Sequence, residues 1–264
     1  MSSSDLTFRF NDGDAYDRYM GVWSRAACPA FLGWLAAPGK AKWLDVGCGT
    51  GALTAAILDS RQPESLLAID PAAAQVETAR KRFTAPHLRF EVADACALPC
   101  RDASCDVVAS ALVVNFIPDR AKAVAEMHRV LRPGGLVGAF VWDFAVDRSP
   151  SGPVRRALAA LGTPPPPVPG TGDSRLPQFS ALFAAAGFVE VETRVFDVAL
   201  DFEDPTAFWI AQSTGFSPVA RFVKGLSEEQ RREAQAMVEA ELEILPGGLA
   251  RYTARANAVK GRKP

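Results

Sequence analysis

Residues 43–51, with the sequence Trp-Leu-Asp-Val-Gly-Cys-Gly-Thr-Gly, constrain the fold more than any other part of the chain. The run Lys42–Val46 predicts a short buried strand, and Ala52–Leu58 carries apolar residues at helical spacing. The three glycines therefore lie in a tight turn between a strand and a helix. Glycine suits such a turn because it accepts positive φ and lets a ligand approach the backbone without meeting a Cβ atom. The free N–H groups at the start of the helix point to the same place.

The length and charge of the chain limit its class. A chain of 264 residues suits one large α/β domain, so we expect residues 1–264 to form a single domain. The net charge of −1 gives no excess of positive charge that would attract nucleic acid or anionic lipid. No apolar run approaches the roughly 18 residues that span a bilayer. We therefore expect neither nucleic acid nor a membrane as a partner.

The cysteines and the N-terminus indicate the cellular compartment. Five cysteines, an odd number, in a chain of this size indicate reduced thiols. The first residues lack the basic and apolar regions of a secretory signal. Both observations predict a cytoplasmic protein. Cys96, Cys100 and Cys105 lie close together, but the sequence has no Cys-x-x-Cys pair, and we expect no metal site.

Strand and helix patterns alternate over the first 150 residues, which is typical of βαβ units around a parallel sheet. We expect strands at 43–46, 66–69, 88–92, 106–110 and 136–142, and helices at 51–60, 72–83 and 119–131. The segment Arg132–Gly135 is expected to end the last of these helices. Its glycines suit the left-handed C-cap, and its proline cannot continue a helix.

The rest of the chain departs from this alternation. Residues 1–40 predict an N-terminal helical segment, whereas the pattern breaks at 147–173, where the proline-rich stretch 163–172 predicts an extended surface loop. Further elements are expected at 176–186, 189–200, 205–224, 227–245 and 249–259, of which 189–200 and 249–259 are strands. Residues 201–248 are too many for a turn, so we expect a helical lid there. Ser227–Gln230 has the form of a capping box.

Three carboxylates accompany the glycine turn. Asp70 ends the second strand, where open α/β sheets bind ligands, and it is suited to hold the hydroxyl groups of a ribose. Asp45 precedes the first glycine by two residues, and a carboxylate there suits an ammonium group better than a pyrophosphate. Asp94 follows the third strand, where a carboxylate can accept a hydrogen bond from an adenine amino group.

The glycine turn and Asp70 also satisfy the fingerprint of an NAD(P)-dependent oxidoreductase. This alternative leaves Asp45 and Asp94 without a role. The sequence also has no Tyr-x-x-x-Lys pair that would transfer the proton linked to hydride transfer.

The combined motifs resemble the class I S-adenosylmethionine-dependent methyltransferases, and among them the ubiquinone/menaquinone biosynthesis C-methyltransferase-like (methyltransferase type 11) group. The segments that carry the resemblance are Leu44–Gly51, Ala68–Pro71, Val92–Ala95, Cys105–Leu112 and Glu126–Gly135. The resemblance implies an α/β fold with a Rossmann-like, seven-stranded mixed sheet in the order 3-2-1-4-5-7-6. Strand 7 would be antiparallel, helices would cover both faces, and the lid at 201–248 would lie between strands 6 and 7.

The same resemblance implies which residues bind S-adenosylmethionine: Tyr16, Trp23, Asp45, Gly47, Cys48, Gly49, Gly51, Asp70, Pro71, Asp94, Ala95, Ser110, Ala111 and Leu112. The glycines would approach the methionine part, and Asp45 would support its amino group directly or through water. Asp70 would hold the ribose, and Asp94 the adenine amino group. Residues 110–112 would line the methionine end. Tyr16 and Trp23 would close the pocket from the N-terminal helix.

We therefore predict an S-adenosylmethionine-dependent methyltransferase that acts on an O, N or C atom of a small molecule, as a monomer or homodimer. A protein that binds S-adenosylmethionine without catalysis is a further alternative, because function belongs to the site and not to the fold. No side chain is assigned as catalytic, and His128 is expected on an exposed helix surface. Position along the chain suggests Asn115, Phe116, Trp142, Asp143, Trp209 and Phe216 for the acceptor pocket.

Overall fold

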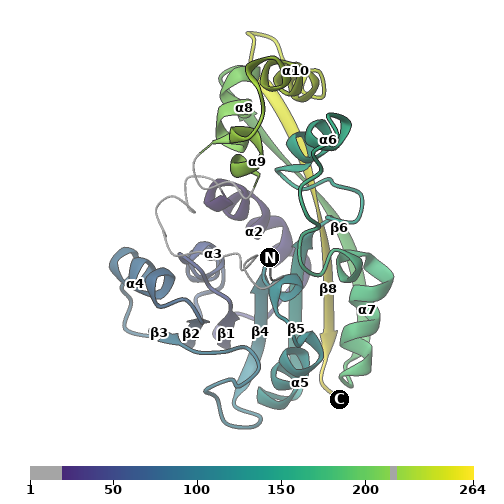
Figure 1. Cartoon of the computed structure of the whole chain (residues 1–264). Coiled ribbons are helices and arrows are strands. Elements are labelled where there is room, and N and C mark those ends of the chain that lie inside the picture. The colour runs from purple at the N-terminus through teal and green to yellow at the C-terminus, as the bar shows by residue number, and fades with distance from the viewer. Residues whose placement is uncertain (1–19, 215–218) are drawn as a thin grey trace.

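The computed structural model describes residues 20–214 and 219–264, which are arranged around one mixed sheet (Figure 1). Within these residues, eight strands form the sheet in the order β3-β2-β1-β4-β5-β8-β6, and β7 pairs with β8 outside this path. Strands β1 to β5 are parallel to one another, and β8 is antiparallel to both β5 and β6. The predicted order is confirmed, because the predicted seventh strand is β8.

The strands are β1 (Lys42–Val46), β2 (Ser65–Asp70), β3 (Leu88–Val92), β4 (Cys105–Ala111), β5 (Leu131–Trp142), β6 (Val189–Phe202), β7 (Glu243–Ile244) and β8 (Ala250–Arg262). The helices are α2 (Val22–Leu35), α3 (Ala52–Arg61), α4 (Ala73–Arg82), α5 (Arg120–Val130), α6 (Gly152–Ala160), α7 (Leu176–Ala185), α8 (Pro205–Ser213), α9 (Ala220–Lys224) and α10 (Glu228–Glu239). Two 3-10 helices, η2 (Val114–Phe116) and η3 (Gly172–Ser174), connect them. The predicted capping box is present at the start of α10.

Successive side chains of a strand point to opposite faces of the sheet, and in the central strands β1, β4 and β5 both faces are buried. Trp43 and Phe140 join a core cluster with residues of α2 and α3. Leu44 of β1 and Val137 of β5 point to the opposite face and join a second cluster with residues of α5 and α7. Burial on both faces explains the continuous apolar run Leu136–Trp142 of β5.

Helix α6 was not predicted, because Pro150, Gly152 and Pro153 were interpreted as part of an irregular segment. Pro153 instead lies in the first turn of the helix, where its missing N–H leaves no hydrogen bond unmade. The proline-rich stretch that follows is held by side chains. Arg155 donates to the Pro166 carbonyl at 3.1 Å, and Asn115 donates to the Pro169 carbonyl at 3.2 Å.

The predicted glycine C-cap of α5 is wrong. The helix ends at Val130, and Leu131 already has extended backbone, with φ −71° and ψ 140°. Leu131 is fully buried and pairs with Cys105 of β4, so sheet pairing begins directly after the helix. Gly134 has φ 75° within β5 and donates its N–H to the Lys263 carbonyl.

Helices α8, α9 and α10 form an insertion between β6 and β8, within the predicted segment 201–248. Strand β5 pairs with residues 256–262 of β8, whereas β6 pairs with β8 from Ala250 onward. The β6–β8 pair therefore projects past the carboxyl end of β5. The insertion lies at this projecting end, where α10 packs against α6 and α8 (Figure 1). Its role as a lid stays a prediction.

Gly138 of β5 marks a close approach between α2 and the sheet. A Cβ atom at this position would lie 2.5 Å from Leu35 Cδ1 and 3.1 Å from Phe31 Cζ. We expect Gly138→Ala to lower the free energy of unfolding by about 1–3 kcal/mol, because α2 must shift.

The matched control is Gly33→Ala in α2, where a Cβ atom meets nothing within 4 Å. Alanine favours a helix interior by about 1 kcal/mol over glycine, so this variant should be at least as stable as the wild type. Urea unfolding measures both changes. A Gly138→Ala protein as stable as the wild type would contradict the packing of α2 on β5.

Candidate functional site

A pocket of about 510 Å³ lies at the carboxyl ends of β1, β2, β3 and β4. Its lining comes from the glycine turn after β1, from Ile69–Ala72, from Ala93–Ala95, from Ala111–Val113 and from Phe116–Pro118. The start of α2 contributes Gly21 and Ser24. Ligands of open α/β sheets bind at such strand ends, and the volume is that of an ordinary small-molecule site.

The backbone of the glycine turn is bound to the end of β2. The N–H groups of Gly47 and Cys48 both donate to the Ile69 carbonyl at 2.8 Å. The N–H of Gly49 donates to Asp70 Oδ2 at 3.0 Å. These three donors hold the turn in place, so they are not free to bind a phosphate, as the N–H groups of a phosphate-binding turn are.

The three glycines of the turn differ in what surrounds their Cβ positions. Gly47, with φ 78°, is approached by Val113, whose Cγ2 would lie 2.4 Å from a Cβ atom. Gly51, with φ 95°, is approached by Phe83, whose Cε2 would lie 2.5 Å from a Cβ atom. Gly49, with φ 53°, has open space at its Cβ position. Gly47 and Gly49 line the pocket, whereas Gly51 begins α3 and does not.

Asp45 lies beneath the turn and is fully buried. Its Oδ2 accepts a hydrogen bond from Thr54 Oγ1 at 2.6 Å, and its Oδ1 has no partner among the described residues. Burial raises the pKa of Asp45 to about 7, and the Asp70 carboxylate contributes to the rise, whereas the Thr54 bond opposes it. Asp45 does not line the pocket, so it reaches a ligand there only through its field, a water molecule or a small movement.

Asp70 ends β2 and lines the pocket. Its Oδ2 accepts from Gly49 and its Oδ1 accepts from the Ala72 N–H at 2.9 Å, so one carboxylate links the turn after β1 to the start of α4. Burial raises the pKa of Asp70, although both hydrogen bonds oppose the rise. Pro71 follows it in the pocket wall.

Asp94 and Ala95 form the pocket wall after β3. The Asp94 carboxylate is exposed, and its Oδ1 accepts from the Cys96 N–H at 2.8 Å. Ala95 is buried among the side chains of the second core cluster. The other predicted residues of the pocket wall are Cys48, Ala111 and Leu112, and all three line it.

Leu112 has a backbone conformation that bulky residues rarely adopt, with φ 64°. Its N–H donates to the Phe140 carbonyl at 2.7 Å, which ties the end of β4 to β5. Ser110, two residues earlier, is fully buried and donates its hydroxyl to the Val46 carbonyl at 2.8 Å. Ser110 therefore joins β4 to β1 and does not line the pocket.

Of the two aromatic residues predicted to close the pocket, Trp23 and Tyr16, the structure describes only Trp23. Trp23 is fully buried and does not line the pocket. Its ring packs edge-on against Trp142 and Tyr252, with centroid separations of 6.2 and 6.1 Å. The large apolar indole is buried in the core, and its neighbours at the start of α2 reach the pocket instead. Tyr16 lies outside the described residues.

Further lining residues carry no motif that sequence reasoning could use. Val113, Phe116, Ile117 and Pro118 lie in the pocket wall only because the chain after β4 folds back over the glycine turn. The sequence indicated these residues only by their position after a strand end, and on that basis Phe116 was the one among them that was predicted.

The remaining candidates for the acceptor pocket are placed as follows. Trp142 and Trp209 are buried in the first core cluster, and neither lines the pocket. Asn115 and Asp143 are buried at the ends of β4 and β5. Phe216 lies outside the described residues.

The expectation that His128 is exposed is wrong. The ring is partly buried and packs edge-on against Phe188, with a centroid separation of 5.0 Å. Burial lowers the pKa of His128, and Lys263 lowers it further. The side chain is on α5, away from the pocket lining, so it fills the contact between α5 and the segment before β6.

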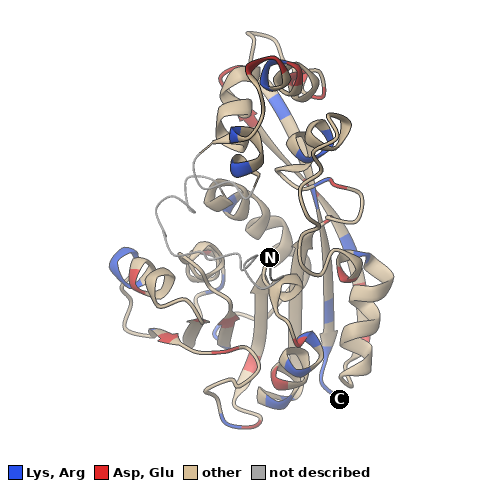
Figure 2. Cartoon of the chain, in the orientation of Figure 1, with Lys and Arg blue, Asp and Glu red and all other residues tan. Residues whose placement is uncertain are grey.

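The charge around the pocket is negative. Asp70 and Asp94 line it, Asp45 lies beneath it, and no Lys or Arg is among its described lining residues. In the view of Figure 2, basic and acidic residues are interspersed over the described elements and do not gather in one patch. No helix in the described ranges is long and apolar enough to cross a bilayer.

Comparisons with known proteins identify the family. Residues 44–138 match a family described as a methyltransferase domain. A malonyl-[acyl-carrier protein] O-methyltransferase from Geobacter sulfurreducens is 33% identical over 198 residues, which are 71% of this chain and 70% of that protein. The ubiquinone/menaquinone biosynthesis C-methyltransferase UbiE from Desulfotalea psychrophila is 32% identical over 98 residues, 37% of this chain and 40% of that protein.

A solved structure shares the fold of this chain. Phosphoethanolamine N-methyltransferase 2 from Haemonchus contortus, solved with S-adenosyl-L-methionine, superposes with a TM-score of 0.61 at 17% identity, over 100% of this chain and 60% of that chain. The chain belongs to the class I S-adenosylmethionine-dependent methyltransferases, and the resemblance inferred from the motifs is confirmed. S-adenosylmethionine is the cofactor of this family. The matches to the first three curated relatives span 36%, 35% and 37% of their lengths.

Asp45 gives the stability of the protein a defined pH dependence. Its folded-state pKa of about 7 lies above its ordinary value of 3.8. The folded protein therefore binds more protons than the unfolded chain between these values, and this contribution to the free energy of unfolding falls as pH rises from about 4 to about 7.

Asp45→Asn should remove this decline. Urea unfolding of wild type and variant at about pH 5, 6, 7 and 8 measures it. The stability of the wild type relative to the variant should fall up to about pH 7 and then stay constant. Parallel pH profiles of the two proteins would show that Asp45 titrates normally.

Proposed function

We propose that this protein transfers the methyl group of S-adenosylmethionine to a small-molecule acceptor. The observation that carries the proposal is the charge of the pocket. Two carboxylates line it, a third lies beneath the glycine turn, and the described lining has no basic side chain. A cofactor with a sulfonium and an ammonium group is attracted by this arrangement, because opposite charges in a partly buried site interact strongly.

The same charges disfavour a nicotinamide dinucleotide. Its pyrophosphate would lie at the glycine turn, where the N–H groups of Gly47, Cys48 and Gly49 already have partners in β2. A phosphate site needs free N–H donors or basic side chains. The glycine turn is therefore better suited to a cationic ligand than to an anionic one.

The proposed roles of the carboxylates follow from their positions. Asp70 would accept hydrogen bonds from the ribose hydroxyls while it holds Gly49 and Ala72. Asp94 keeps its Oδ2 for the adenine amino group, because Oδ1 is used by Cys96. The unpartnered Oδ1 of Asp45 would face the ammonium group, directly or through water.

When bound, S-adenosylmethionine supplies a methyl group on a sulfonium, which an acceptor attacks in line as the carbon–sulfur bond breaks. The task of the protein is then to align the acceptor and to exclude water. The wall formed by Leu112, Val113, Phe116 and Ile117 is apolar and suits this task. The insertion at 201–248, which projects at the carboxyl ends of the strands, is proposed to act as the lid. Tyr16 is proposed to help close the pocket.

Calorimetric titration with S-adenosylmethionine and with NADH tests the cofactor. We expect a saturable heat with S-adenosylmethionine and none with NADH. Binding of NADH in preference to S-adenosylmethionine would support the oxidoreductase alternative and remove this proposal.

The identity of the acceptor is tested by release of S-adenosylhomocysteine. The names of the relatives include O- and C-methylation, so the panel should contain carboxylic acids, phenols, amines and activated carbon acids. Protein that binds S-adenosylmethionine but releases no S-adenosylhomocysteine with any member would favour a non-catalytic binding protein.

Asp70→Ala should weaken the binding of S-adenosylmethionine by at least about tenfold, because charge-assisted hydrogen bonds contribute roughly 1.5–3 kcal/mol each. Asp70→Asn keeps one acceptor oxygen and the size of the side chain, so its loss should be smaller. Calorimetry measures both dissociation constants, and circular dichroism checks the fold. Unchanged affinity of a folded Asp70→Ala protein would show that Asp70 does not hold the ribose.

A further inference from the structure

The segment 93–104, between β3 and β4, contains no helix or strand, and its first three residues line the pocket. Its first anchor is the Ala93 N–H, which donates to the Asp70 carbonyl at 3.2 Å. Within the segment, Asp94 accepts from Cys96 through its side chain and from Ala97 through its carbonyl. Such a segment needs further contacts to keep one conformation, because an ordered residue loses about 1–2 kcal/mol of backbone entropy.

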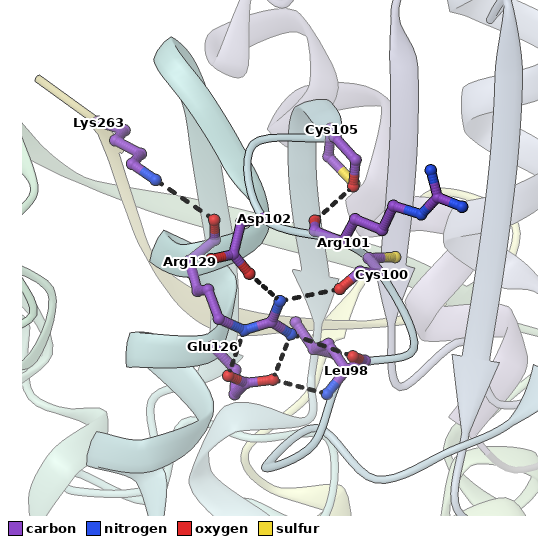
Figure 3. Close-up of polar contacts among 9 residues, drawn as sticks. Leu98, Cys100, Arg101, Asp102, Cys105, Glu126, Arg129 and Lys263 are labelled. Atoms are coloured by element: carbon purple, nitrogen blue, oxygen red, sulfur yellow. Dashed lines mark hydrogen bonds and ion pairs between the residues drawn. The ribbon is translucent and has the colours of Figure 1, made fainter.

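These contacts come from Arg129 of α5, whose guanidinium lies at the centre of Figure 3. Its Nη1 donates to the Cys100 carbonyl at 2.9 Å and to Asp102 Oδ1 at 2.7 Å. Its Nη2 donates to the Leu98 carbonyl at 3.1 Å. Three positions of the segment are therefore bound to one side chain.

Glu126, one turn earlier on α5, fixes the orientation of Arg129. Its Oε1 accepts from Nε at 2.6 Å and its Oε2 accepts from Nη2 at 2.7 Å, which is a bidentate pair. The same Oε2 accepts the Leu98 N–H at 2.8 Å. The pair lowers the pKa of Glu126 and raises that of Arg129. With these contacts the N–H groups of the guanidinium are fully used.

The anchored residue Leu98 lies close in sequence to the pocket wall. Glu126 and Arg129 bind both its N–H and its carbonyl, and its side chain is buried beside Ala95 in the second core cluster. The backbone of Arg129 adds a further bond, because its carbonyl accepts the Ala103 N–H at 3.1 Å. Asp94 and Ala95 thus lie between one anchor on β2 and one on α5.

We propose that Arg129, oriented by Glu126, is a positioning residue that sets the adenine end of the cofactor pocket by holding segment 93–104. The inference rests on the proposed function, because it assigns Asp94 to the adenine amino group. It adds that recognition of adenine depends on a side chain of α5 that does not line the pocket.

Arg132 provides a matched control in the same stretch of chain. Its guanidinium pairs with Asp106, its side chain is 55% exposed, and among the described residues it has no hydrogen bond or ion pair with segment 93–104. Arg132→Met removes the same kind of side chain as Arg129→Met, but it leaves the segment bound. Glu126→Gln tests the orienting carboxylate, and Arg129→Lys keeps the charge without the fork of N–H donors.

The test compares S-adenosylhomocysteine with S-inosylhomocysteine, in which a carbonyl oxygen replaces the adenine amino group. The ratio of their dissociation constants, measured by calorimetry on the full chain, reports recognition of the amino group. Arg129→Met should weaken S-adenosylhomocysteine binding by about tenfold, while the ratio falls toward one. Arg129→Lys and Glu126→Gln should show the same trend, and Arg132→Met should match the wild type within about twofold.

Hydrogen exchange gives a second readout that does not need a ligand. Arg129→Met should increase exchange at the amides of Leu98 and Ala103, whereas Arg132→Met should leave these amides unchanged. Faster exchange at both amides supports the anchor even if the Arg129→Met protein has a lower melting temperature.

One result would overturn the inference: a folded Arg129→Met or Arg129→Lys protein whose ratio of dissociation constants is that of the wild type. If both ligands bind more weakly by the same factor, the ratio is likewise unchanged, and Arg129 then has a structural role only. Wild-type protein that binds neither ligand would instead contradict the proposed function, so the two failures are distinguishable.

Discussion

The architecture of the pocket depends on the contact between the glycine turn and the end of β2. The Ile69 carbonyl accepts two N–H groups of the turn, and the Asp70 carboxylate accepts a third together with the Ala72 N–H. This contact brings β1, β2, α3 and α4 to one point. It also satisfies the donors that a phosphate-binding turn would leave free. This feature supports the proposal that the pocket takes a cationic ligand.

Burial of Asp45 adds an electrostatic constraint to this contact. A carboxylate with no exposure is costly when charged, so its pKa rises to about 7 although Thr54 donates to it. A positive ligand group above the turn would offset part of this cost. Under the proposed function, binding of an ammonium group near Asp45 would therefore also stabilise the fold.

Segment 93–104 shows how a methyltransferase pocket is built from parts distant in sequence. The residues of the segment that line the pocket follow β3, but Leu98 of the same segment is bound by Glu126 and Arg129, which come after β4. Sequence reasoning recognised both motifs as marks of the family and had no means to connect them. The connection required the parallel pairing of β1 with β4, which places α5 beside the loop that follows β3.

The sequence determined the order of the strands through its resemblance to the family, and its short-range patterns placed the glycine turn, Asp70 and Asp94 at strand ends, where ligands bind. Tertiary structure alone decided that Trp23 is core, that Gly51 admits Phe83, that Ser110 joins two strands, and that Pro153 lies in the first turn of a helix. Each of these outcomes depends on which distant side chain fills a given space. Local propensity contains no information about such packing.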